Sequence, residues 1–265
     1  IGAGECDGLC YLALAYCPGE TLAKWLQNCG KPATPDDAAE IVLALADAVE
    51  HAHENGVLHR DIKPQNVLLD PTVRFQNLPF SPKLTDFSIA KLADGEGSET
   101  ATDVLLGTAR YMAPELAAGR RDQLGPACDI YALGVVLYEL LTGREPINGT
   151  SHADTLRRVL SDEPVRPRKL SPAVPRDLEA ICLTCLEQAP QRRYASAALL
   201  AADLQRYLHH QATIARPIGP LERIYRWVRR RPAAAGLIGL TLAASLLLLL
   251  GLTLHSRQLS AVNLD

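Results

Sequence analysis

The stretch HRDIKPQN, at residues 59–66, decides the fold of this chain. It places a carboxylate, an ammonium group and a carboxamide close together in the sequence. Twenty residues beyond Asn66 the chain continues with DFS at residues 86–88, and APE follows at residues 113–115. Each short motif alone would be a weak signal, because such strings are common by chance. Their order and separations together make a chance match negligible.

These strings fit the H-R-D-x-x-x-x-N, D-F-G and A-P-E motifs of protein kinases. From about Gly8 to His210 the chain resembles this family, and the strings GTARYMAPE and DIKPQN resemble its bacterial, eukaryotic-type Ser/Thr branch. The resemblance implies an α+β, protein-kinase-like fold, with a mainly α C-lobe and a remnant of the sheet of the smaller lobe. It also implies ATP and Mg²⁺ as cofactors, and protein hydroxyls as acceptors of the γ-phosphate.

The same resemblance assigns catalytic roles to individual residues. Asp61 is expected to accept the proton of the substrate hydroxyl, and Lys63 is expected to contact the γ-phosphate. Asn66 and Asp86 are expected to bind Mg²⁺ through a carbonyl oxygen and a carboxylate. Thr108 is expected to form a hydrogen bond near Asp61 and Lys63.

The nucleotide is expected to lie against the connection that follows the first strand. By resemblance, Leu14 is the gatekeeper, and the backbone groups of Ala15 and Cys17 meet the adenine edge. Leu68 is expected to form the floor of the adenine pocket.

A regulatory segment is expected between Asp86 and Glu115. Its centre is polar and contains glycine, and Thr100 and Thr102 are the predicted autophosphorylation sites. A phosphothreonine adds about −1.5 to −2 charges, which Arg60 could pair with. An unmodified, solvated loop is the alternative.

Three further residues are expected to be structural. Glu115 should form a buried pair with Arg193, and Asp129 should hold the backbone of the catalytic loop. His59 is expected to pack and form hydrogen bonds rather than act as a second base.

Helices are predicted from caps and apolar periodicity. Thr34 and Pro35 suit the N-cap and the first position of a helix that ends before Gly56. The stretch DIYALGVVLYELL is apolar nearly all round, which predicts a helix buried on every side. The predicted helices span residues 21–28, 34–55, 129–141, 153–160, 175–187 and 196–209.

Other local patterns carry structural predictions only. Residues 8–16 predict a buried strand, and the glycines within residues 1–8 predict a turn before it. His53 is predicted to be a helix-surface residue. The seven cysteines are odd in number, and Cys182 and Cys185 fall on an apolar helix stripe, which favours core residues over a metal or redox pair.

The sequence also departs from the family pattern. Ser88 replaces the glycine of D-F-G, which restricts the backbone angles open to that position. No G-x-G-x-x-G loop, V-A-I-K lysine or partner glutamate is found, so this piece is expected to be weakly active or inactive. Two explanations stay open: a truncated smaller lobe, which the missing initiator Met favours, or a membrane-tethered pseudokinase scaffold.

The C-terminal part predicts a membrane anchor. The run Ala233–Leu254 is uncharged and apolar over 22 residues, reaching about 33 Å as a helix, enough for a hydrocarbon core of about 30 Å. A buried core helix is the disfavoured alternative. Six arginines fall between residues 216 and 231, so the positive-inside tendency predicts that everything before the run is cytoplasmic. Ala235, Gly239 and Ala243 form a small-residue row compatible with a homodimer.

Nucleic acid is not an expected partner, because the formal net charge is −3 and no basic, aromatic-rich patch occurs in the body of the chain. The predicted division of the chain is a smaller-lobe remnant with hinge (1–19), the C-lobe (20–210), a basic juxtamembrane segment (211–232), the membrane span (233–254) and an extracytoplasmic stub (255–265).

Overall fold

The computed structural model describes residues 2–6, 9–87, 109–120 and 125–216. These residues belong to one compact unit, except for His210–Ala212. Among them, no helix is both long and apolar enough to cross a bilayer. The predicted span at 233–254 lies outside the described residues and stays a prediction.

The first described elements form a β-hairpin. Strand β1 (Gly2–Cys6) pairs antiparallel with β2 (Leu9–Ala13), with Cys6 opposite Leu9. The predicted turn within residues 1–8 is therefore wrong, because most of it is strand. The register leaves only Asp-Gly between the two strands, a pair favoured in two-residue hairpins.

The strand predicted within residues 8–16 is confirmed as β2, but the predicted burial is wrong. Tyr11 is 55% exposed and Tyr16 is 89% exposed. In the part of the chain that the structure describes, the hairpin is a two-stranded sheet with no third strand.

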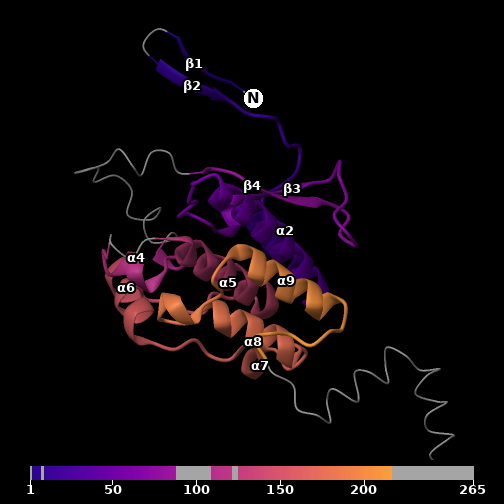
Figure 1. Ribbon diagram of the computed structural model, residues 1–265, viewed down its shortest axis with the longest axis vertical. Coiled ribbons are helices and arrows are strands. Elements are labelled where there is room, and N and C mark those ends of the chain that lie inside the picture. Colours follow the sequence, from indigo (N-terminus) through magenta and orange to yellow (C-terminus); the bar gives the residue numbers. More distant parts are fainter. Residues whose placement is uncertain (1, 7–8, 88–108, 121–124, 217–265) are drawn as a thin grey trace, which may run out of the picture. The chain divides into compact units, whose positions relative to one another are not determined.

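The rest of the unit is a mainly helical lobe with one more antiparallel pair of strands (Figure 1). The strands are β3 (Val67–Asp70) and β4 (Ser81–Leu84). The helices and 3-10 turns are α1 (Leu22–Cys29), α2 (Pro35–Glu54), η1 (Pro64–Asn66), α4 (Pro114–Ala117), α5 (Pro126–Thr142), α6 (His152–Ser161), α7 (Pro167–Leu170), α8 (Arg176–Cys185), η4 (Pro190–Arg192) and α9 (Ala197–Leu208). The six helices predicted from sequence are all present, with small differences at their ends.

Local chemistry explains several helix ends. The Thr34 hydroxyl accepts a hydrogen bond from the Asp37 amide at 3.1 Å and caps α2. Gly30 and Gly143 follow α1 and α5 with φ of 59° and 74°. Such left-handed angles cost glycine little, so each glycine ends its helix.

Helix α5 lies at the centre of the lobe, and α2 and α8 pack against it. A Cβ on Gly134 would stand 2.5 Å from the Cβ of Cys185, so this glycine lets α5 and α8 approach closely. Cys182 and Cys185 are both 0% exposed, which confirms them as core residues. Burial raises the pKa of both thiols, which keeps them protonated and unreactive.

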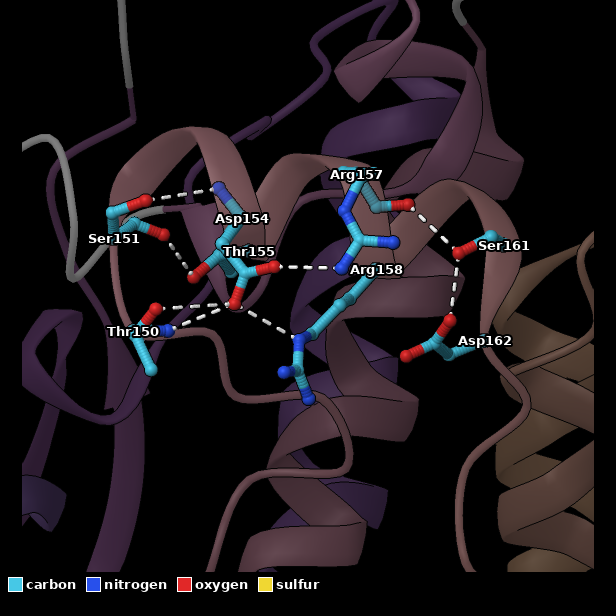
Figure 2. Close-up of polar contacts among 8 residues, drawn as sticks. All are labelled: Thr150, Ser151, Asp154, Thr155, Arg157, Arg158, Ser161 and Asp162. Atoms are coloured by element: carbon cyan, nitrogen blue, oxygen red, sulfur yellow. Dashed lines mark hydrogen bonds and ion pairs between the residues drawn. The ribbon is translucent and has the colours of Figure 1, made fainter.

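A network of polar contacts fixes the start of α6 (Figure 2). The Ser151 hydroxyl accepts a hydrogen bond from the Asp154 amide at 3.1 Å. The Asp154 carboxylate accepts from Arg157 at 2.8 Å, from Arg158 at 3.0 Å and from the Thr150 amide at 3.0 Å. The hydrogen bond from Arg157, followed by that from Thr150, lowers the pKa of Asp154 to about 2.

A buried ion pair ties α4 to the connection between α8 and α9. Two nitrogens of Arg193 meet the two carboxylate oxygens of Glu115 at 2.7 and 2.8 Å, and these side chains are 0% and 2% exposed. Arg193 also donates to the carbonyls of Ala127 and Glu187. Burial acts most strongly on the Glu115 carboxyl and would raise its pKa, but the hydrogen bonds and charge of Arg193 outweigh it, so the pKa is lowered.

A second contact joins the segment before α4 to α5. The Tyr111 hydroxyl donates to the Glu139 carboxylate at 2.6 Å, and Arg110 pairs with Glu145 at 2.7 Å. Burial raises the pKa of Glu139 to about 7, although the hydrogen bond from Tyr111 opposes the change.

The Arg193→Met substitution should lower the free energy of unfolding by about 3–5 kcal/mol, because it leaves a buried carboxylate without its partner. Arg192→Met is the matched control, since the Arg192 side chain is 77% exposed. Denaturant unfolding of both variants measures the difference. Equal stability of the two variants would contradict the structural role of the pair.

Glu139 should make stability depend on pH. An unfolded glutamate titrates near about 4.3, so between that pH and about 7 the folded chain binds the extra proton. Its stability therefore falls as pH rises through this window. Glu139→Gln keeps an acceptor for Tyr111 and removes the titration, so the variant should gain about 1–3 kcal/mol over the wild type above the window and little below it.

Urea unfolding on either side of that pH window measures this difference. Glu163→Gln, at an exposed position, is the control and should show no such pH dependence. A Glu139→Gln effect of the same size on both sides would exclude Glu139 as the titrating group.

Candidate active site

A buried carboxylate holds the loop that contains HRDIKPQN. Asp129, in the first turn of α5, is 1% exposed. Its carboxylate accepts hydrogen bonds from the backbone amides of His59 at 3.0 Å and Arg60 at 2.8 Å. Arg60 has a φ of 62°, an uncommon angle for a residue with a side chain, and the two bonds help to hold it there.

His53 is part of this arrangement, and its prediction as a helix-surface residue is wrong. Its side chain is 7% exposed, and its Nε2 lies 2.8 Å from the Asp129 carboxylate. The signal that could have found it is its position four residues after the fully buried Val49, on the same face of α2. The partner itself is far away in the sequence and gives no local signal.

His59 connects this loop to the segment that follows β4. Its Nε2 lies 2.9 Å from the Thr85 carbonyl oxygen, which can only accept, so Nε2 carries the proton. Its Nδ1 then accepts from the Asp61 amide at 3.3 Å. The His59 ring also contacts Phe87, with ring centroids 4.6 Å apart, and the residue is buried. These contacts are those of a packing and positioning residue.

Asp61, Lys63 and Asn66 converge at the other end of the loop. The Lys63 ammonium lies 3.2 and 3.0 Å from the two carboxylate oxygens of Asp61. The Asn66 amide nitrogen donates to the Asp61 carboxylate at 3.1 Å and to the Asp61 carbonyl at 2.8 Å. The Asp61 side chain stays 16% exposed. The carboxylate is therefore fixed in orientation and still accessible from solvent.

Asp86 is brought towards this cluster by the pairing of β3 with β4. Val67 stands opposite Leu84, and the Thr85 amide donates to the Asn66 carbonyl at 2.9 Å. Asp86 follows directly, is exposed and has a φ of 59°. The register thus places Asn66 and Asp86 at neighbouring strand ends.

The chemistry of Asn66 and Asp86 fits a magnesium ion. Because the amide nitrogen of Asn66 is turned to Asp61, its carbonyl oxygen is on the opposite side of the carboxamide. An amide oxygen and a carboxylate are hard ligands, and Mg²⁺ commonly takes only one or two protein ligands, completing its shell with water and phosphate.

The residues predicted to bind adenine are only partly brought together. Leu68 lies on β3, where it bridges to Thr21. A Cβ on Gly19 would stand 1.6 Å from the Leu69 carbonyl, so this glycine allows the preceding connection to pass close to β3. Leu14 is 60% exposed, however.

Ala15 is exposed and Cys17 is intermediate in exposure. Among the described residues, only the β1–β2 hairpin precedes the connection that contains Leu14 and Ala15. No described element packs over these two residues. The predictions for Ser88, Thr100, Thr102 and Thr108 lie outside the described residues.

Comparisons with known proteins show the family to which this chain belongs. A family model described as protein kinase domain matches residues 3–205. The serine/threonine-protein kinase PknB of Mycobacterium tuberculosis is 36% identical over 197 residues, which is 74% of this chain and 30% of PknB. The serine/threonine-protein kinase PrkC of Bacillus subtilis is 37% identical over 202 residues, which is 76% of this chain and 30% of PrkC.

A solved structure is also similar. The crystal structure of a cysteine-to-alanine mutant of the Mycobacterium tuberculosis PknI kinase domain aligns with a TM-score of 0.56 and 25% identity, covering 77% of this chain and 68% of that one. The chain thus spans about 30% of the length of PknB and PrkC. Because the family model matches most of this chain, the chain belongs to the protein kinase domain family.

Proposed function

We propose that this chain provides the phosphoryl-transfer lobe of a Ser/Thr protein kinase that uses ATP and Mg²⁺. One observation carries the proposal: the Asp61 carboxylate is held by Lys63 and Asn66 on a loop fixed by buried Asp129. Relatives at 36–37% identity are named serine/threonine-protein kinases, which supports the same reaction class. Protein substrates follow from that class.

The geometry suits the demands of the reaction. Phosphoryl transfer passes through a loose transition state, so a protein mainly positions groups and neutralises charge. Asp61 would orient the substrate hydroxyl and accept its proton, while the Lys63 ammonium would meet the transferred phosphate. Asn66 holds Asp61 through its nitrogen and, with Asp86, would hold Mg²⁺, which supplies charge neutralisation at the phosphates when bound.

We also propose that Ala233–Leu254 anchors the protein in a membrane by a single span, with the lobe in the cytoplasm. The support is the uncharged apolar run and the arginines that precede it. The row of Ala235, Gly239 and Ala243 supports self-association through the same segment.

A membrane-tethered scaffold without catalysis is the second candidate. It is the alternative expectation from the sequence, in which the 265 residues contain no Gly-rich loop and no ATP-binding lysine. The two candidates differ in one observable property, which is phosphate transfer by the full-length protein.

Asp61→Asn in the full-length protein should lower the rate of phosphate transfer about 10²–10⁴-fold, because the amide cannot accept the hydroxyl proton. Nucleotide binding should change little, since the side chain keeps its shape. Glu54→Gln, at an exposed position at the end of α2, is the control for a lost carboxylate. A radiolabelled ATP assay measures both variants.

Wild-type-like transfer by Asp61→Asn would remove this residue as the base. A full-length wild type that binds nucleotide but transfers no phosphate would support the scaffold instead.

Autophosphorylation should occur at Thr100 and Thr102 in the active full-length protein. Arg60 supports this expectation, because its Nε is buried without a hydrogen-bond partner among the described residues and could pair with a phosphate. Mass spectrometry should find both threonines modified, and Thr100→Ala/Thr102→Ala should lose most of the incorporated phosphate. Ser98→Ala is the control. Two unmodified threonines in an active preparation would contradict the assignment.

A further inference from the structure

One surface of the lobe is basic without any acidic residue between its charges. Residues 164–176 contain Arg166, Arg168, Lys169 and Arg176 and no aspartate or glutamate. Arg166, Lys169 and Arg176 are exposed, and none of the three forms an ion pair within the described part of the chain. These three residues are called the basic face below.

The fold gathers the basic face onto two adjoining helices. The Arg168 amide donates to the Glu179 carboxylate at 3.0 Å, which fixes α7 against the first turns of α8. Arg176 is the first residue of α8. Figure 1 shows α7 and α8 together at the edge of the lobe away from β3 and β4.

The nearby acids offset this charge at Arg166, because the exposed Glu163 and the partly exposed Glu187 line the same pocket as Arg166. Glu179 is 8% exposed and its carboxylate faces the Arg168 amide. Asp177 is paired with Arg216 at 3.0 Å. The outward-facing charge of this surface is therefore positive at Lys169 and Arg176.

The described lobe ends at the same surface. The Arg216–Asp177 pair places the last described residue beside Arg176. The preceding amides of Ile214 and Ala215 donate to the buried Asp203 carboxylate at 2.6 and 3.0 Å, which fixes this exit. The position at which the chain leaves the lobe is thus part of the fold.

The sequence beyond this exit leads quickly to the apolar run. Sixteen residues, 217–232, separate Arg216 from Ala233. Fully extended they would span at most about 55 Å, and as a helix about 24 Å. A lobe on so short a connection stays close to any bilayer that holds the run.

Exposed apolar side chains accompany the charges. Val165 is 49% exposed beside Arg166, and Ile214 is 56% exposed two residues before Arg216. Basic residues next to exposed apolar ones are the combination that binds a lipid–water interface.

We propose that the basic face docks on the anionic headgroups of the membrane that holds Ala233–Leu254, and so orients the lobe with β3 and β4 directed away from the lipid. The proposal rests on the membrane attachment proposed above. Each basic residue near an anionic surface strengthens binding about fivefold, so Lys169 and Arg176 together favour the docked state by about 25-fold.

Hydrogen exchange of the full chain in lipid nanodiscs tests the proposal. Amides within 165–176 should exchange more slowly in discs that contain phosphatidylserine than in discs of phosphatidylcholine alone. High salt should remove the difference, because it screens the charges. Arg166→Glu/Lys169→Glu/Arg176→Glu should also remove it. The matched control is Lys24→Glu/Lys31→Glu/Arg74→Glu, three positions on other elements, which should keep it.

Several outcomes would overturn the proposal. Exchange that does not depend on lipid charge would do so, as would an equal loss of protection in the control variant. Equal protection by soluble polyphosphate added to phosphatidylcholine discs would assign the face to an acidic macromolecule instead. Co-elution with the discs measures membrane insertion separately. A chain that inserts but shows no protection would contradict only the docking. A chain that does not insert would contradict the membrane attachment as well.

Discussion

The candidate site depends on one buried carboxylate that accepts hydrogen bonds from two backbone amides of the loop. Asp129 reaches out of the central helix α5 and binds the amides of His59 and Arg60. Arg60 is held at a positive φ, and the side chain of Asp61, which follows it, stays 16% exposed. Lys63 and Asn66 contact the Asp61 carboxylate from within the same loop. The loop that carries these three side chains is thus fixed by its contact with a buried residue of α5.

The lobe uses buried carboxylates repeatedly to join distant segments. Glu115 binds Arg193, Asp203 binds the exit segment at Ile214, and Asp129 binds the loop. Removing a carboxylate from water costs desolvation free energy, and each of these carboxylates offsets it by accepting several hydrogen bonds. Such ties specify where segments lie more than they add stability. This suits a protein whose chemistry needs fixed side chains.

The sequence predicted best what depends on neighbouring residues. Thr34 as a cap, Pro35 as the first residue of a helix and the all-round apolar pattern of α5 are local signals, and the structure has all of them. The resemblance to kinases gave the loop residues and the pairing of Glu115 with Arg193, which no local pattern could have supplied. The β1–β2 hairpin is not predicted, because the glycines in residues 1–8 favour a turn, although in the structure Gly2 and Gly4 lie in strand β1.

What the sequence missed lies in contacts between distant residues. His53 meets a partner 76 positions away, and the Asn77 amide meets the buried Glu40 carboxylate at 3.0 Å. The contact between Asn77 and Glu40 fixes the polar connection from β3 to β4 against the lobe. Leu78, in the same connection, is buried in the core.

The hold of Asp203 on the exit segment has a mechanical consequence. Its carboxylate accepts hydrogen bonds from the amides of Ile214 and Ala215, so two bonds join the exit segment to one side chain of α9. The hydroxyl of Tyr194, before α9, donates to the same carboxylate. A pull on the chain beyond Arg216 would load these two bonds before it reached the C-terminal end of α9 at Leu208. Traction from the C-terminal side would therefore be passed to the middle of α9 before its last turn.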